Sequence, residues 1–288
     1  MISHKTVMRF MEIATLMKTN APSFPDKIIV NLFYEPSTRT SCSFQTAAYK
    51  LGCKVISITD KYSSVEKGET LEDTIRTVGY YGDVIVLRHP EKGSFARAQA
   101  VSRVPVINAG DGNGEHPTQG LLDIYTIYDE LLKRDLKVGD DYITVTFVGD
   151  LLNSRTVHSL VKILKEIKNV QMIFVSPPGL ELDEADGIHN MMLREAIGLT
   201  DVLYVTRLQK ERFKDIGQYS KIVQCYDDYR VTPELLKYAK PTAIVMHPLP
   251  RGPELDTRVD DDPRAVYFKQ VENGVYMRMA ILESLFKA

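Results

Sequence analysis

The chain has 288 residues, of which 44% are hydrophobic and 26% are charged. This composition is typical of a folded globular protein with one large domain or two domains of ordinary size. The 36 basic and 38 acidic residues leave a formal net charge of -2, so no overall charge attracts nucleic acid or an acidic membrane surface. We therefore expect neither nucleic acid nor a membrane as a partner.

The apolar runs and the cysteines indicate in which compartment the protein is expected. The longest apolar runs, residues 142–148 and 243–246, are too short to span a bilayer. The first residues lack a signal-peptide pattern, so we expect a cytoplasmic protein. Cys42, Cys53 and Cys225 are odd in number and form no CxxC pair. They indicate buried or idle thiols rather than a disulfide framework or a zinc site.

Short strand-like runs alternate with helical segments in the first part of the chain. The expected strands are 27–33, 54–58, 84–87 and 104–108, and the expected helices are 41–51, 70–81 and 93–100. Such alternation predicts parallel strands with crossover helices. A glycine-rich break at 108–114 follows, and His116-Pro117 begins a helix that extends to about residue 132.

The same alternation starts again after this helix. The expected strands are 143–148, 171–175, 202–205 and 243–246, with a helix at 156–167. A final apolar segment, 276–286, has helical spacing and is predicted to return to the first module. We predict an α/β fold of two doubly wound parallel-sheet domains joined by helices, with one domain at 1–116 plus 272–288 and the other at 117–271.

Hydroxyl groups and an arginine follow the first expected strand. Ser37, Thr38, Arg39 and Thr40 lead into a helix, so backbone N–H groups, hydroxyls and one guanidinium would converge at a helix amino terminus. That arrangement is suited to phosphate, because the helix end is partly positive and an arginine fork matches phosphate oxygens. The alternative is that Ser37 or Thr38 serves only as a helix N-cap.

Further polar residues stand at other predicted strand ends. Arg88 ends a β-run, and His116 and Gln119 lie at the start of the helix after the glycine-rich break. In sheets of this kind, ligands bind at the carboxyl ends of the strands. Arginine, imidazole and amide could there hold a phosphate and a planar carbonyl group, although a histidine at a helix start can also be a cap or a packing residue.

A series of motifs in this order resembles the aspartate transcarbamoylases from about Val30 to the carboxyl terminus. The motifs are STRT, SSVEKGET, LRHP, GEHPTQ, SRTVHS, TRLQKERF and HPLPR. STRT and HPTQ mark the wider transcarbamoylase family, whereas TRLQKERF and HPLPR are typical of the aspartate branch. The ornithine branch carries a cysteine at the position of Leu249.

The resemblance implies the transcarbamoylase fold and transfer of a carbamoyl group from carbamoyl phosphate to L-aspartate, an early step of de novo pyrimidine synthesis. It assigns carbamoyl phosphate binding to the first domain and aspartate binding to the second. The residues implied for the phosphate are Ser37, Thr38, Arg39, Thr40 and Arg88, and those around the carbamoyl group are Arg39, Thr40, His116 and Gln119. Donors placed at the carbonyl oxygen stabilise the charge that develops there during attack.

The loop with Ser63 and Lys67 would, by the same resemblance, reach into the site of a neighbouring subunit. By itself this segment is a solvated loop with a capping pattern. In the resembled enzymes the loop completes the neighbouring site, so both residues would bind substrate in trans and Lys67 would take part in catalysis. The resemblance therefore implies a homotrimer with shared active sites.

For L-aspartate the resemblance implies Arg155, Arg207 and Gln209, because two guanidinium groups suit a dicarboxylate. Without it, each arginine could be an ordinary surface ion-pair residue. Two further pairs have implied roles: backbone carbonyls of Leu249 and Pro250 would face the substrate amine, and Glu35 and Arg212 would make interdomain contacts in a closed form.

No covalent enzyme intermediate, no cofactor and no metal are implied. Regulatory chains, or fused or associated enzymes of pyrimidine synthesis, are possible partners. The alternatives are a transcarbamoylase for ornithine or a modified amino acid, a catalytically silent homologue, and a nucleotide-dependent enzyme. The last is suggested by Val148-Gly149-Asp150 after a strand, but this segment lacks the GxGxxG spacing of dinucleotide-binding enzymes.

The chain departs from the family at Asn153-Ser154, where an aromatic or basic residue and a glycine are usual, and it is shorter between 175 and 201.

Overall fold

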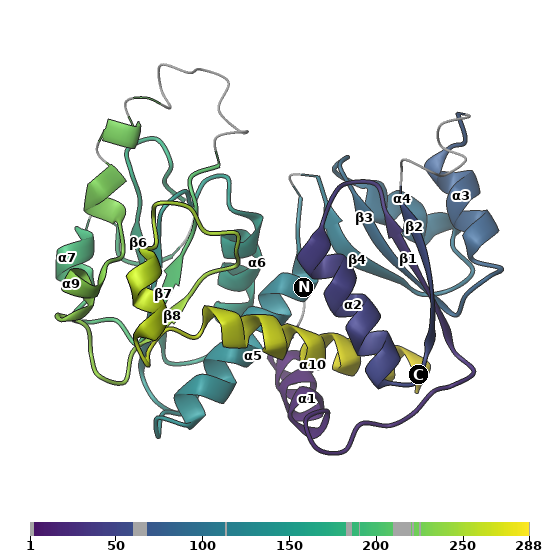
Figure 1. The fold of residues 1–288 in the computed structure, drawn as a ribbon, viewed down its shortest axis with the longest axis horizontal. Helices are drawn as coiled ribbons and strands as arrows, with labels where there is room; N and C mark the ends of the chain where they lie inside the picture. Colours follow the sequence, from purple (N-terminus) through teal and green to yellow (C-terminus); the bar gives the residue numbers. More distant parts are fainter. Residues whose placement is uncertain are drawn as a thin grey trace. The chain divides into compact units, whose positions relative to one another are not determined.

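The computed structural model describes residues 3–59, 68–112, 114–182, 186–189, 191–209, 220, 222–224 and 226–287. Strands and helices alternate along these residues (Figure 1). The elements of the first part are α1 (His4–Leu16), β1 (Ile28–Phe33), α2 (Thr38–Lys50), β2 (Lys54–Thr59), α3 (Leu71–Val78), β3 (Val84–His89), α4 (Ser94–Val101), β4 (Val106–Asp111) and α5 (Pro117–Leu132). Those of the second part are β5 (Ile143–Val148), α6 (Arg155–Leu164), β6 (Val170–Val175), α7 (Leu193–Ala196), β7 (Val202–Val205), α9 (Pro233–Leu236), β8 (Ile244–Met246) and α10 (Tyr267–Phe286), with short 3-10 helices at Tyr226–Tyr229 and Thr257–Asp261.

The chain divides into two units. Unit 1 comprises Met1–Leu122 and Val271–Ala288, and unit 2 comprises Asp123–Gln270. The division falls inside α5, whereas the sequence placed it at the start of that helix, because a boundary within a continuous helix leaves no break in the periodicity. Within the described residues, no helix is both long and apolar enough to cross a membrane.

Unit 1 contains a parallel sheet with the strand order β2-β1-β3-β4. After β1 the chain adds β2 on one side and then crosses to place β3 on the other side of β1. The strand order therefore reverses between β1 and β3, where the carboxyl ends of open parallel sheets form their ligand site.

Alternation along the strands decides what each face of this sheet contacts. Val30, Leu32, Ile85 and Leu87 pack in one apolar cluster with residues of α3 and α4. Asn31 points the other way, because successive side chains of a strand alternate, and its amide donates to Ser41 Oγ of α2 at 3.0 Å. Helix α2 thus covers the opposite face.

Unit 2 repeats the plan with the strand order β6-β5-β7-β8, again all parallel. The order reverses between β5 and β7. On one face, Val148, Val175, Val205 and Val245 pack with residues of α7 and α9. The α/β class with two parallel sheets, predicted from the alternation of elements, is confirmed.

The other face of this sheet carries aromatic residues. Phe147 lies 5.5 Å from Phe174 and 5.6 Å from Tyr204 between ring centroids. Tyr204 donates through its hydroxyl to Asp123 of α5 at 2.7 Å, and Gln270 of α10 donates to the same carboxylate at 2.6 Å. These residues are buried, so the hydrogen bonds satisfy polar groups that would otherwise destabilise the core.

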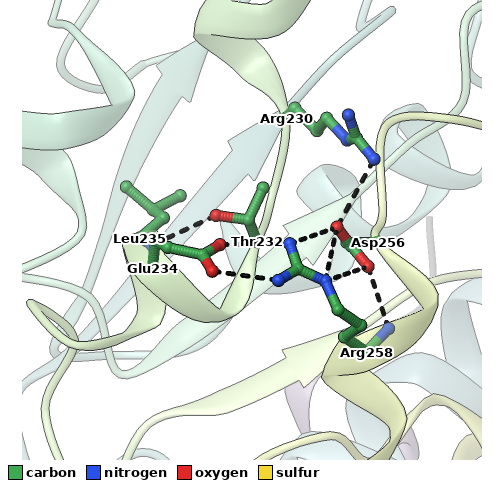
Figure 2. Close-up of polar contacts among 6 residues, drawn as sticks. All are labelled: Arg230, Thr232, Glu234, Leu235, Asp256 and Arg258. Atoms are coloured by element: carbon green, nitrogen blue, oxygen red, sulfur yellow. Dashed lines mark hydrogen bonds and ion pairs between the residues drawn. The ribbon is translucent and has the colours of Figure 1, made fainter.

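A cluster of charged residues joins α9 to the start of the second 3-10 helix (Figure 2). Asp256 accepts hydrogen bonds from Arg258 N at 2.9 Å and from Arg258 Nη2 at 2.9 Å. Arg258 also pairs with Glu234 at 3.0 Å, and Arg230 lies 3.4 Å from Asp256. The cluster brackets the isolated bridge between Val231 and Leu255.

Element ends differ from the predicted ones at two informative places. β4 was expected to end where the glycine-rich break begins, but it continues to Asp111, which pairs with His89 of β3. Pairing with a neighbouring strand there overrides the glycine signal. α10 begins at Tyr267 rather than at residue 276, and the helices α1, α7 and α9 were not predicted.

Candidate active site

The residues predicted to bind a phosphate lie at the amino terminus of α2. The helix begins at Thr38, and the contact between Asn31 and Ser41 fixes its first turn beside β1. Ser37 occupies the N-cap position, yet among the described residues its hydroxyl makes no capping hydrogen bond. The helix start thus presents its partial positive charge next to a hydroxyl that makes no capping hydrogen bond.

A buried arginine stands at the end of the neighbouring strand. Arg88 of β3 is 9% exposed, and alternation along the strand puts its side chain on the α2 face of the sheet. Its Nη2 lies 2.6 Å from Glu35 Oε1, and its Nη1 donates to Ala109 O at 3.2 Å. Burial lowers the pKa of Arg88, Glu35 opposes this, and Arg39 adds to the lowering. Because an arginine stays protonated in proteins, Arg88 and Arg39 both contribute positive charge to this site, and Glu35 pairs with Arg88.

His116 adds an imidazole to the same edge of the sheet. It is 5% exposed and precedes α5. Its Nε2 lies 3.5 Å from Thr40 Oγ1, and its Nδ1 lies 3.4 Å from Thr118 Oγ1. Gln119 follows in the first turn of α5 and is half-buried. Guanidinium, hydroxyl and imidazole groups therefore converge where the strand order of unit 1 reverses.

In unit 2, two arginines lie after the carboxyl ends of neighbouring strands. Arg155 is the first residue of α6, after β5, and Arg207 follows β7. β5 and β7 are neighbours, with Val148 opposite Val205. Both arginines thus lie at the reversal point of the second sheet, where a ligand with two carboxylates could be bound.

The ends of β5 and β7 approach each other closely. Gly149 has a φ of +114°, and a Cβ atom added there would lie 2.2 Å from Thr206 O. A side chain is therefore excluded by space as well as by backbone conformation. Thr206 N donates to Val148 O at 2.8 Å, so the backbone is fixed directly before Arg207.

A buried carboxylate connects the loops that follow these two strands. Asp150 is fully buried and accepts hydrogen bonds from Asn153, in the loop after β5, and from the backbone of Gln209, after β7. Burial raises the pKa of Asp150, while these hydrogen bonds and the charge of Arg207 act in the opposite direction. Asp150 thus connects the loop after β5, which leads to Arg155, with the segment after β7, which carries Arg207 and Gln209.

The HPLPR segment after β8 is ordered by a buried histidine. Leu249 N donates to His247 Nδ1 at 2.8 Å, so the ring proton is on Nε2, which lies 2.9 Å from Glu254 Oε1. Gly252 N donates to the same oxygen at 2.7 Å. Burial would raise the pKa of Glu254, but the hydrogen bonds from His247 and Gly252 lower it below its ordinary value. The peptide bond between Leu249 and Pro250 is cis.

Two pairs of the predicted site residues contact each other in the structure. The structure brings Thr40 together with His116 and Arg88 together with Glu35. Ser63, Lys67 and Arg212 lie outside the described residues. The contact of Glu35 described here is within unit 1, and its interdomain role stays a prediction.

Three groups around the site were missed by sequence reasoning. Thr118 belongs to the HPTQ motif, and its hydroxyl could have been noted there. Asp150 lies two residues after the end of β5, which is a weak signal for a site residue. Glu254 carries no local signal, since its contact with His247 depends on the path of the loop between them.

Comparison with known proteins identifies the family of the chain. Residues 1–129 match the family model described as the aspartate/ornithine carbamoyltransferase carbamoyl-P binding domain, and residues 141–285 match the Asp/Orn binding domain of the same family. The aspartate carbamoyltransferase catalytic subunit of Methanocaldococcus jannaschii is 49% identical over 272 residues, which are 91% of this chain and 85% of that protein. The multifunctional protein pyr1-3 of Dictyostelium discoideum is 46% identical over 273 residues, which are 91% of this chain but only 12% of that protein.

Solved structures agree with this result. The aspartate transcarbamoylase of Trypanosoma cruzi in complex with N-(phosphonacetyl)-L-aspartic acid has a TM-score of 0.91 and 38% identity, covering 98% of this chain and 92% of that chain. The same enzyme in complex with carbamoyl aspartate and phosphate has a TM-score of 0.89 and 38% identity, covering 99% and 93%. From the motifs, the two matching domains and these similarities, we conclude that the chain belongs to the aspartate/ornithine carbamoyltransferase family.

Proposed function

We propose that this chain transfers the carbamoyl group of carbamoyl phosphate to the α-amine of L-aspartate, giving N-carbamoyl-L-aspartate and phosphate. The observation that carries the proposal is the convergence of Arg88, the α2 amino terminus and the Thr40–His116 pair at the reversal point of unit 1. This arrangement supports the proposal, because guanidinium groups suit a phosphate and hydroxyl and imidazole groups can donate to a carbonyl oxygen. The catalytic subunits and substrate complexes among the relatives support the same reaction.

In this proposal, unit 1 binds carbamoyl phosphate. Ser37, Thr38, Arg39 and Arg88 hold the phosphate, because a helix amino terminus and two guanidinium groups offset its negative charge. Glu35 pairs with Arg88 at 2.6 Å, so an arriving phosphate has to compete with or displace this carboxylate. The pair keeps the buried guanidinium compensated until an anion binds.

The carbamoyl carbon is attacked directly by the amine of aspartate. A C–N bond forms as the C–O bond to phosphate breaks, and the phosphate departs with the electron pair of that bond. Negative charge gathers on the carbonyl oxygen, where His116, Thr40 and Arg39 donate hydrogen bonds and Gln119 contacts the carbamoyl group. Phosphate itself can accept the proton that the amine loses, so no covalent enzyme intermediate is needed.

We assign L-aspartate binding to unit 2. Arg155 and Arg207 would each bind one carboxylate, with Gln209 beside them, and this orientation of the α-amine lowers the barrier by restricting its approach. A cationic acceptor such as ornithine would place an ammonium group against two guanidinium groups, which is costly in a site that excludes water. The backbone carbonyls of Leu249 and Pro250 are proposed to accept from the amine.

We further propose that the active form is a homotrimer in which Ser63 and Lys67 of one subunit complete the site of its neighbour. Cytoplasmic location, interdomain contacts of Glu35 and Arg212, and association with regulatory chains or other enzymes of pyrimidine synthesis stay predictions. Relatives described as multifunctional proteins, of which this chain matches only a small part, support association with other enzymes.

The decisive experiment measures N-carbamoyl-L-aspartate formed from carbamoyl phosphate and aspartate by the purified chain, with ornithine as the parallel acceptor. Product from aspartate alone supports the proposal. Product from ornithine would favour the other branch of the family, and no product from either acceptor in a folded trimer would favour a catalytically silent homologue. Incubation with carbamoyl phosphate alone, followed by mass spectrometry of the intact protein, tests for a covalent carbamoyl adduct.

A further inference from the structure

Asn153 is one of the two adjacent residues, with Ser154, at which the sequence departs from the pattern of the resembled family, and the structure gives it a specific contact. Its backbone N–H donates to Asp150 Oδ1 at 3.1 Å. Its side-chain amide donates to Asp150 Oδ1 at 2.9 Å and to Asp150 Oδ2 at 3.2 Å. Asn153 therefore holds both oxygens of a fully buried carboxylate.

The same carboxylate reaches the other predicted aspartate-binding loop. Gln209 N donates to Asp150 Oδ2 at 3.2 Å, across a separation of 59 residues in the sequence. One oxygen of Asp150 is thus shared between Asn153 and Gln209. Because a buried carboxylate needs several donors to remain ionised, removal of the Asn153 amide would weaken the anchor for Gln209.

The two anchored loops carry the two arginines. Arg155 lies two residues after Asn153, and Arg207 lies two residues before Gln209. The interaction between Asn153 and Asp150 is therefore in a position to set the separation between two guanidinium groups. That separation has to match the distance between the two carboxylates of the bound acid, and an error of about 1 Å in a supporting contact can cost about 100-fold in rate.

We propose that Asn153 is a positioning residue that, through Asp150, fixes the loop of Arg155 relative to the loop of Arg207 and Gln209 and thereby tunes selection for L-aspartate over longer dicarboxylates. This inference rests on the proposed function of the chain. Asn153 itself contacts no substrate in this scheme. Its effect is exerted on the KM for aspartate and on the discrimination between aspartate and glutamate, while carbamoyl phosphate binding in unit 1 is unaffected.

The test is Asn153→Asp, which keeps the size of the side chain but replaces two donors by a second carboxylate beside Asp150. We expect the KM for aspartate to rise about 10- to 100-fold, the range for loss of a hydrogen bond to a charged group, and the preference for aspartate over glutamate to fall. The dissociation constant for carbamoyl phosphate should stay within about twofold of the wild-type value. Asn20→Asp makes the same chemical change at an exposed asparagine of unit 1 and serves as the matched control.

A purely structural role is separated from positioning by an exchange of the two side chains. In the double variant Asp150→Asn with Asn153→Asp, the amide at position 150 donates to the carboxylate at position 153, which removes the repulsion between two carboxylates. The one carbonyl oxygen of that amide can accept from the backbone N–H of residue 153 or of Gln209, but not from both. The increase in the KM of the double variant for aspartate should be at least tenfold smaller than the product of the increases in the two single variants, because the effects of substituting two residues in direct contact are coupled. An unchanged KM in Asn153→Asp, whether or not its melting temperature falls, or full additivity of the KM effects in the double variant, would overturn the inference.

A second measurement does not depend on catalysis. In protein labelled with 15N-glutamine, the amide hydrogen of Gln209 should exchange at least tenfold faster in Asn153→Asp than in the wild type, because its acceptor is destabilised. Unchanged exchange contradicts the linkage whether or not the chain is active. Absence of product from the wild-type chain would instead refute the proposed function, so the two failures are distinguishable.

Discussion

Glu254 offers the sharpest test of how the HPLPR segment is held. It is 1% exposed and accepts hydrogen bonds from His247 Nε2 at 2.9 Å and from Gly252 N at 2.7 Å. A hydrogen bond to a charged acceptor contributes about 1.5–3 kcal/mol, and a buried donor left unpaired costs about 1–3 kcal/mol. Gly252 is exposed and can donate to water instead. Glu254→Ala should therefore lower the free energy of unfolding of unit 2 by about 3 kcal/mol.

Glu254→Gln is the matched variant. Its amide oxygen can accept both hydrogen bonds, so only the contribution of the charge is lost, and we expect a decrease of about 1 kcal/mol. The sign of the pH dependence follows from the lowered pKa of Glu254. A carboxylate with a lowered pKa stabilises the fold above its ordinary pKa, near 4.3, and this stabilisation is lost as the pH falls through the lowered value. The difference between the wild type and Glu254→Gln should accordingly shrink below about pH 4.

Urea denaturation at fixed protein concentration, followed by far-UV circular dichroism, measures these changes, since the chain contains no tryptophan. Glu234→Gln serves as a control, because Glu234 is an exposed partner of Arg258 and surface ion pairs contribute little. The KM for aspartate should rise in Glu254→Ala, because the Leu249 peptide loses its ordered histidine acceptor. A stability of Glu254→Ala within about 0.5 kcal/mol of the wild type, or equal losses in the Ala and Gln variants, would refute the reasoning.

Three other outcomes are expected. Arg207→Ala should raise the KM for aspartate about 10- to 100-fold with little change in carbamoyl phosphate binding, and equal loss of both affinities in titration calorimetry would contradict the division of labour between the units. Lys67→Ala and Arg39→Ala should each be nearly inactive, yet an equimolar mixture of their subunits should recover about a quarter of the wild-type activity, because one in four sites of a random trimer is intact; mixed trimers without recovery would exclude shared sites. The hydrogen bonds from Arg258 lower the pKa of Asp256 to about 2. The melting temperature of Asp256→Asn should therefore be lower than that of the wild type at neutral pH but not near pH 2. A constant difference in melting temperature across that range would contradict this assignment.

Much of the fold follows from the sequence because its signals are local. Runs such as Ile143–Val148 are apolar and β-branched over one strand length, and the helices between such runs show apolar residues on one face. Parallel strands with crossover helices are then the simple consequence. The position of Ser37, Thr38 and Arg39 at a helix start was predictable for the same reason, since the hydroxyls, the arginine and the helix are contiguous in the chain.

The bounds that failed show where local signals stop. Glycines at 110 and 112 predicted a break, but β4 reaches Asp111 because β3 supplies its hydrogen-bond partners. The extra turns of α10 before residue 276 contain Gln270, whose amide binds Asp123. Polar residues of that kind weaken an apolar helical pattern, although in the fold they are buried and satisfied.

The sequence by itself determined the alternation of strands and helices, the placement of polar residues at strand ends and the family to which their motifs point. Only the tertiary structure decided which of these residues meet: Thr40 and His116 are 76 residues apart, Asp150 and Gln209 are 59 residues apart, and Gly149 is required because Thr206 O lies against it. The physical reason is that propensity and periodicity act over one element, whereas these contacts depend on the strand order that places β1 beside β3 and β5 beside β7.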